Sequence, residues 1–112
     1  MAKVIITKTL EKEVNKFFKK ESLKIFKLMK SLEHFPKKGK HLAQVDRISI
    51  KELKYKSYRF YFITDSYKIK ILDERELTDL LIKFVRMSHK RNQQNVIEEI
   101  KKILKILGGE GF

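Results

Sequence analysis

The stretch Glu52–Phe62, ELKYKSYRFYF, governs the fold prediction because it combines β-forming residues with a short polar turn. Such a pattern predicts two β-strands joined in a hairpin. The second strand, Tyr58–Thr64, is apolar on both faces apart from Arg59, which is typical of a central strand covered on both sides. Alternation places Arg59 on the face of Tyr61 and Ile63. At the first position after the turn, its long side chain can leave the core and reach a groove.

The first strand of the hairpin, Arg47–Tyr55, has a break in its alternation. Its apolar residues follow one phase before Lys51 and the other phase after Glu52, so one face cannot hold them all. A β-bulge near Lys51–Glu52 would restore a single apolar face, and bulges often re-aim side chains beside active sites. A strand that starts at Lys51 would also remove the conflict, and the sequence favours neither interpretation.

Three further strands are predicted from apolar residues: Val4–Thr7, Tyr67–Leu72 and Leu80–Ser88. A turn at Asp65–Ser66 leads into Tyr67–Leu72, whose two lysines are expected to face outward. An acidic loop or single helical turn, Asp73–Asp79, precedes the last strand.

Three helices are predicted from apolar residues spaced three and four apart. The first follows a cap at Thr7 or Thr9, and the second ends at Pro36, before the basic loop Lys37–Lys40. The third starts near Asn92 and ends at the Gly-Gly pair that follows it. Their apolar stripes contain Leu10, Val14, Phe17 and Phe18; Ile25, Leu28, Met29 and Leu32; and Val96, Ile97, Ile100, Ile103, Leu104 and Leu107.

Consecutive strands after a helical pair predict an α+β fold. In it, two N-terminal helices and a C-terminal helix pack on a twisted antiparallel sheet of four or five strands. The chain has 112 residues with no repeat and no linker, so residues 1–112 are expected to form one domain. There is no cysteine, no signal-peptide pattern and no apolar run of about 18 residues, so we expect a soluble cytoplasmic protein.

The charge is strongly basic: 27 Lys and Arg oppose 14 Asp and Glu, for a formal net charge of +13. Such an excess favours a polyanionic partner and accelerates the encounter with it. Nucleic acid is the first candidate, a ribosome surface the second and an anionic membrane the third; solvated, lysine-rich helix faces are the alternative explanation. His34, His41 and His89 lie far apart without metal-ligand spacing, and no phosphate-binding glycine loop occurs, so neither a metal nor a cofactor is expected.

Basic and polar residues gather near the predicted strand ends. If the strand of Glu52 and Lys54, the strand that opens with Arg59 and the segment Arg86–Asn95 pair as neighbours, these residues would surround one concave patch. Arg offers a forked donor to phosphate oxygens, Lys adds charge, and Glu or His can transfer protons. RNA supplies its own nucleophile, the ribose 2′-hydroxyl, which removes the need for a metal. Solvent-facing strand residues and a polar connector would explain the same pattern without any function. The candidates for phosphodiester chemistry are Glu52, Lys54, Arg59, His89 and Arg91, and the further phosphate contacts are Lys51, Lys56, Arg86 and Lys90.

The ordered combination of these segments resembles the RelE/ParE superfamily of toxin–antitoxin toxins, especially its HigB-like branch. The stretch Ile50–Phe62, IKELKYKSYRFYF, resembles that branch's Glu-Leu-Arg, spacer, Tyr-Arg and aromatic sequence. The stretch Phe84–Leu104, FVRMSHKRNQQNVIEEIKKIL, resembles its last strand, basic pair, Gln/Thr-rich turn and helix. The likeness covers almost the whole chain, and it rests on the order of the segments rather than on one specific motif.

The resemblance implies a compact α+β fold and, for the RelE and HigB branches, metal-independent cleavage of mRNA in the ribosomal A site. By position, Arg59 matches the arginine that contacts the scissile phosphate, and Lys54 matches a basic residue of the preceding strand. Lys90–Arg91 matches the basic pair after the last strand. His89 stands where some members have a general acid. Glu52 stands where members have Lys or Glu, as a base or an orienting partner.

Two functions follow from this comparison. The first is the toxin of a type II toxin–antitoxin system: a ribosome-dependent mRNA interferase that is inhibited by a cognate antitoxin and needs no membrane. The alternative is a non-catalytic member, either a ParE-like gyrase inhibitor or an RNA- or ribosome-binding module. Glu52 and His89 favour the first, because a pure binder needs only cations. The chain departs from the family in its Asp73–Asp79 insertion, an extended hairpin at Tyr67–Leu72, and the lack of the usual proline and of the tyrosine that some members use.

Overall fold

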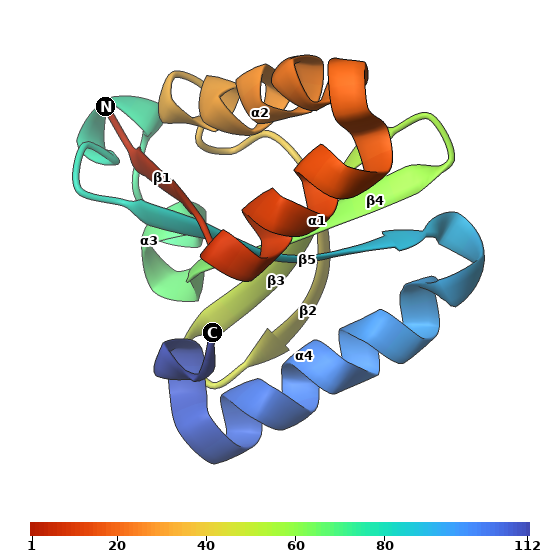
Figure 1. Cartoon of the computed structure of the whole chain (residues 1–112). Helices are drawn as coiled ribbons and strands as arrows, with labels where there is room; N and C mark the ends of the chain where they lie inside the picture. Colours follow the sequence, from red (N-terminus) through yellow and green to blue (C-terminus); the bar gives the residue numbers. More distant parts are fainter.

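The structure, a computed structural model, describes residues 1–112 and consists of a five-stranded sheet with helices on both faces (Figure 1). The strands are β1 (Lys3–Ile6), β2 (Lys40–Val45), β3 (Ile48–Tyr55), β4 (Tyr58–Asp65) and β5 (Leu81–His89). Their order in the sheet is β1-β5-β4-β3-β2. β4 therefore lies in the centre, which confirms the prediction made from its apolar sequence.

The sheet is mixed, and the predicted purely antiparallel sheet is wrong at one edge. β1 runs parallel to β5, whereas β5, β4, β3 and β2 are antiparallel to their neighbours. β1 and β5 come from opposite ends of the chain, so no hairpin imposes an antiparallel direction on them.

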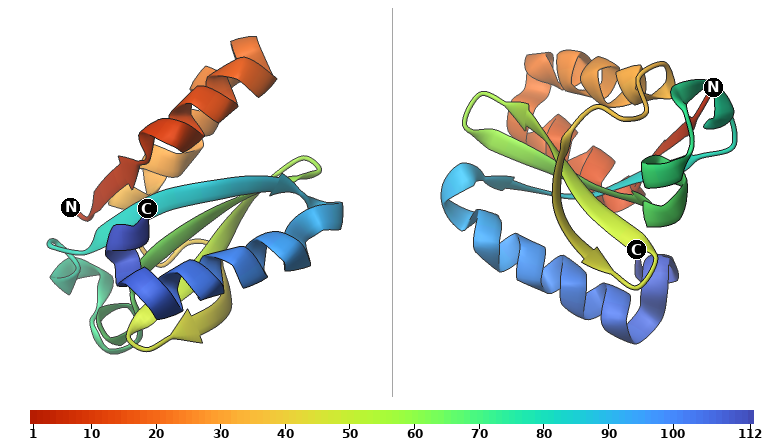
Figure 2. Two further views of the ribbon diagram at one scale, coloured as in Figure 1. Left: turned by 60° about the horizontal axis from the view of Figure 1, so that its bottom comes forward. Right: turned by 180° about the vertical axis from the view of Figure 1, so that it is seen from behind.

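The helices are α1 (Lys8–Phe18), α2 (Ser22–Lys30), α3 (Ser66–Ile71) and α4 (Gln93–Leu107). α1 and α2 cover one face of the sheet, and α4 covers the other (Figure 2). The predicted helical pair and C-terminal helix are thus confirmed, and the coarse α+β fold with them. None of the helices combines the length and apolar character that crossing a bilayer requires.

Each face of the sheet has its own apolar cluster, and the two clusters explain the broken alternation of β3. Ile48 and Ile50 pack on the α4 side, and Leu53 and Tyr55 pack on the side of α1 and α2. β3 pairs with β4 without interruption over its whole length. A bulge near Lys51–Glu52 and a strand start at Lys51 are therefore both wrong. Both phases of the strand are simply buried.

The irregularity in this part of the sheet lies in β2, for which the sequence predicts no element. Its pairing with β3 shifts between His41 and Ala43. β2 is an edge strand in which only Val45 is buried. A bulge and so little burial leave no period-two signal to detect.

The predicted strand Tyr67–Leu72 is wrong, because these residues lie in and just after the short helix α3. The carboxylate of Asp65 accepts the Lys68 backbone N–H at 2.9 Å and caps the helix. Of the apolar residues that alternate here, only Ile69 is buried; Tyr67 and Ile71 are exposed. The extended hairpin is therefore absent, whereas a single helical turn does form in the acidic segment that follows, at Glu74–Glu76.

Candidate functional site

The β3–β4 turn, the end of β5 and the segment before α4 meet at one end of the sheet (Figure 1). Lys54 is the pairing partner of Arg59, and Tyr58 is the partner of His89. The Lys90 backbone N–H donates to the Ser57 carbonyl at 2.8 Å, so the pairing of β4 with β5 continues beyond the end of β5. The three segments are thus neighbours, which is the condition for the expected patch. We call Lys54, Arg59, Lys90 and Arg91 the basic end.

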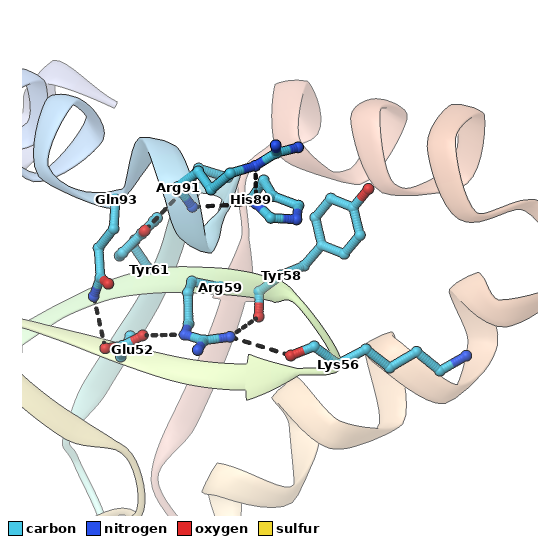
Figure 3. A network of polar contacts seen from close by, with 9 residues as sticks. Glu52, Lys56, Tyr58, Arg59, Tyr61, His89, Arg91 and Gln93 are labelled. Carbon is cyan, nitrogen blue, oxygen red and sulfur yellow. Dashed lines mark hydrogen bonds and ion pairs between the residues drawn. The ribbon is translucent and has the colours of Figure 1, made fainter.

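Arg59 is held by an ion pair and two backbone carbonyls (Figure 3). Its Nε lies 3.2 Å from Oε2 of Glu52, and the two side chains are only 12% and 2% exposed. Its Nη1 donates to the carbonyls of Lys56 at 3.2 Å and Tyr58 at 3.0 Å. The guanidinium therefore has little freedom, which is what a fixed phosphate donor requires.

Glu52 is enclosed by its partners. Its Oε1 accepts a hydrogen bond from Nε2 of Gln93, in the first turn of α4, at 2.8 Å. Its Oε2 is buried and has only the ion-pair contact with Arg59, without an aligned hydrogen bond. At 2% exposure this carboxylate is out of reach of a ribose hydroxyl. The geometry gives it the role of orienting Arg59 rather than that of a base.

His89 caps the turn that carries the two basic residues after β5. Its Nδ1 accepts the Arg91 backbone N–H at 3.1 Å and faces the Arg91 Nε at 3.4 Å. In the neutral ring the proton therefore sits on Nε2, as a donor. Loss of hydration, followed by the positive charges of Arg91, Lys90 and Arg59, lowers the pKa of His89 below its usual 6.5.

The predicted patch is divided over two faces of the sheet end. Alternation along β3 and β4 places Glu52, Lys54 and Arg59 on the α4 side, with Tyr61. Tyr58 and its partner His89 lie on the α1 side, where their rings are 5.4 Å apart. The sequence predicts one concave patch, but in the structure Arg59 and His89 lie on opposite faces of the sheet end.

The side chains of three predicted phosphate contacts are engaged with partners in the protein. Lys56 forms an ion pair with Glu21 at 2.6 Å and ties the β3–β4 turn to the α1–α2 connection. Arg86 pairs with Glu99 of α4 at 3.0 Å. Lys51 is 5% exposed and donates to the Lys37 carbonyl at 3.2 Å. Burial, followed by repulsion from Lys37, lowers the pKa of this buried amine.

Apart from Arg59, the cations of the basic end face solvent with little opposing charge. Lys54, Lys90 and Arg91 are exposed and form no ion pair. Lys90 and Arg91 also line an open groove of about 480 Å³ between the start of β2 and the start of α4. Its lining contains no acid and includes Lys40, His41, Gln93 and Gln94. This groove extends the basic surface beyond the predicted residues.

Sequence reasoning missed Lys40, His41 and Gln93 as site residues. The two β2 residues reach the site only because β2 pairs with β3, and the sequence gives no signal for that strand. Gln93 lies 41 positions from its partner Glu52, and only the docking of α4 brings them together. The basic loop before β2 was the one available hint.

A larger hollow, of about 640 Å³, lies at the opposite end of the sheet. Its lining mixes both signs, with Arg47, Lys68 and Lys83 against Asp65, Asp79 and Glu110. Lys83 already donates to the carbonyls of Gly109 and Phe112. This mixed lining does not select a polyanion, and nowhere in the chain do three His, Cys, Asp or Glu side chains gather as a metal site would need.

Comparison of the chain with protein-family models, with curated proteins and with solved structures finds no match. The resemblance to the RelE/ParE superfamily therefore stays a prediction that rests on the order of its sequence segments.

Proposed function

We propose that this chain is a RelE-like toxin that binds mRNA on the ribosome and cleaves it as a metal-independent endoribonuclease. The observation that carries the proposal is the guanidinium of Arg59, held by Glu52 and two carbonyls beside the free ammonium of Lys54. An oriented arginine of this kind matches the oxygens of a phosphodiester. The net charge of +13 and the acid-free groove next to it support a polyanionic ligand.

In the proposed reaction, the ribose 2′-oxygen attacks the adjacent phosphorus and loses its proton. The bond from phosphorus to the 5′-oxygen of the next nucleotide breaks, and that oxygen takes up a proton. The products are a 2′,3′-cyclic phosphate and a 5′-hydroxyl end. Arg59 would stabilise the negative charge that develops on the phosphate oxygens, an effect worth about 3–4 kcal/mol for one well-placed donor. Glu52 acts as a positioning residue for Arg59.

The same proposal includes the partners that such a toxin has. It would work in the cytoplasm, on ribosomes, and a cognate antitoxin would cover the basic end with acidic residues. Binding to the ribosome and cleavage of the message are separate activities, and each has its own measurement.

A second candidate, a non-catalytic RNA- or ribosome-binding protein or a gyrase inhibitor, is favoured by one specific observation. Neither group that could act as a base is free: the Glu52 carboxylate is 2% exposed in its ion pair, and Nδ1 of His89 caps the following turn, which leaves only the Nε2–H of His89 as a donor. A binder requires only the exposed cations.

A translation extract with one defined message separates the candidates. We expect the purified protein to produce cuts at ribosome-occupied codons in primer extension, and we expect the fragments to carry 2′,3′-cyclic phosphate and 5′-hydroxyl ends. Binding to ribosomes without any cut would favour the non-catalytic candidate. Blocked supercoiling by gyrase without ribosome binding would overturn the RNA proposal altogether.

A further inference from the structure

Aromatic rings from three elements meet beside the basic end, on the α1 side of the sheet. Tyr58 of β4 contacts Phe17 and Phe18 of α1, with ring centroids 5.2 Å and 5.1 Å away. The ring of His89, at the end of β5, lies 5.4 Å from Tyr58 at an interplanar angle of 81°. We call Phe17, Tyr58 and His89 the aromatic ledge.

Phe17 is the exposed member of the ledge. It is 58% exposed, whereas Leu10 and Val14 of the same helix are fully buried. The neighbouring Phe18 packs inward against Tyr55 and Phe60 and joins α1 to the core. The core is thus complete without Phe17, and most of that side chain remains available to a ligand.

The ledge is joined to the basic end by direct contacts (Figure 3). The carbonyl of Tyr58 accepts Nη1 of Arg59 at 3.0 Å, and the ring of His89 accepts the Arg91 N–H at 3.1 Å. Two of the three ledge residues therefore contact a cationic residue directly, Tyr58 through its backbone carbonyl and His89 through Nδ1 of its ring. Proteins that bind single-stranded nucleic acid use this combination, with cations on the phosphates and aromatic faces under unstacked bases.

We propose that the aromatic ledge is a nucleobase-binding site for single-stranded RNA. Phe17 presents its exposed ring to a base, Tyr58 supports Phe17 from below, and Nε2 of His89 is free to donate to a base or a phosphate oxygen. This inference rests on the proposed function and narrows the substrate to a strand whose bases are unstacked. A base-paired helix keeps its bases stacked inside and cannot use the ledge.

The charge around the ledge favours this ligand over an apolar helix from a protein partner. Lys16, Lys19 and Lys20 flank the two phenylalanines in the chain. Glu21, the acid that follows them, is already paired with Lys56 at 2.6 Å. An exposed ring among unpaired cations matches a polyanion that carries aromatic bases.

Two oligonucleotides of equal length and charge test the proposal. One is a single-stranded RNA, and the other has the same sugar-phosphate backbone without bases. We expect the wild-type protein to bind the base-bearing strand at least about fivefold more tightly, the lower end of the effect of one stacked base. Phe17→Leu keeps apolar bulk but removes the ring, so it should lose this preference while its affinity for the abasic strand stays unchanged.

Phe35→Leu is the matched control, because Phe35 is 57% exposed and takes part in no ring contact of the ledge. It should keep the full preference. Equal wild-type affinity for the two strands would overturn the ledge and leave the proposed RNA binding standing. A preference that survives in Phe17→Leu would also overturn the ledge. Absence of binding to either strand would overturn the proposed function, and this inference with it.

Discussion

Glu52 and Arg59 face each other across β3 and β4 at 3.2 Å, and the carboxylate of the pair is almost completely removed from water. Arg59→Ala would leave this buried charge without its partner, which typically costs 3–5 kcal/mol in the free energy of unfolding. We expect a loss of about that size in urea denaturation. The double variant Arg59→Ala/Glu52→Gln removes the charge as well and should recover more than half of the loss. A single variant as stable as the wild type would contradict this structural role.

The same pair determines how activity must be tested. An inactive Arg59→Ala protein would not distinguish a catalytic arginine from a lost fold. Arg59→Lys keeps a positive charge beside Glu52 but gives up the two carbonyl contacts of Nη1 and the forked donor. If Arg59 contacts the scissile phosphate, this variant should cleave message at least about tenfold more slowly, while it loses much less stability than Arg59→Ala because Glu52 keeps a cationic partner. Full activity of Arg59→Lys would remove the need for an oriented guanidinium.

His89 should titrate below the ordinary histidine range. The folded state favours the neutral ring, so its contribution to stability is present above about pH 6.5 and is lost as the pH falls through the lowered pKa. Two-dimensional NMR of the ring should show an Nε2–H tautomer at neutral pH and a pKa below 6.5. Addition of an RNA oligonucleotide should raise that pKa, because phosphates stabilise the imidazolium. Titration of free His89 above 6.5 would show that the Arg91 N–H does not hold Nδ1.

The sequence predicts a helix or strand correctly where the spacing of its own buried residues is enough to determine the structure. The sequence of β4 predicts a central strand because both its faces are apolar. The sequence of α4 predicts a helix because its apolar stripe continues for four turns. The sequence predicts poorly where a single contact determines the structure, whether that contact is local or long-range. A single capping contact from Asp65 makes α3 a helix despite strand-like alternation, and β2 exists only as a partner for β3.

The candidate site follows the same division. The β3–β4 hairpin brings Lys54 and Arg59 together, as its sequence pattern predicts, whereas His89 at the end of β5 lies on the other face of the sheet. The pairing of Arg59 with Glu52 and the burial of Lys51 depend on what α4 and the Lys37–Lys40 loop place over the sheet. The alternation of side chains along a strand assigns each residue to the correct face of the sheet, but it does not show which face is exposed to solvent.

Lys51 is a buried amine whose removal should stabilise the protein. Its pKa is lowered mainly by burial, so the wild type gains stability as the pH rises through that value toward 10.5 and lacks this gain at neutral pH. Lys51→Met keeps the length of the side chain and removes the desolvation cost. We expect it to be about 1 kcal/mol more stable at pH 7, with the difference vanishing near pH 10.5. Exposed Lys38→Met is the control, and a less stable Lys51→Met would show that the Lys37 carbonyl contact outweighs the cost.

Gly39 allows the basic loop to close over β3. It has a φ of +102°, and a Cβ there would lie 2.9 Å from the Glu52 carbonyl oxygen and 2.9 Å from Cζ of Phe62. Gly39→Ala should therefore lose at least about 2 kcal/mol in denaturation, from strain and from steric overlap together. Gly108→Ala separates the two causes, because that residue has a φ of +66° with nothing within 4 Å. Equal losses in the two variants would mean that the overlap relaxes at no cost.

Lys54 and Lys90 should contribute separable phosphate contacts. For single-stranded RNA the logarithm of the binding constant falls with the logarithm of the salt concentration, with a slope of about −0.7 for each phosphate contact. Lys54→Ala and Lys90→Ala should each make this slope shallower by about that amount and weaken binding most at low salt. Lys105→Ala is the matched control, since it removes an exposed lysine from the last turn of α4, at the other end of that helix. If all three variants change the slope equally, the protein binds RNA through its overall charge, and the basic end has no special role.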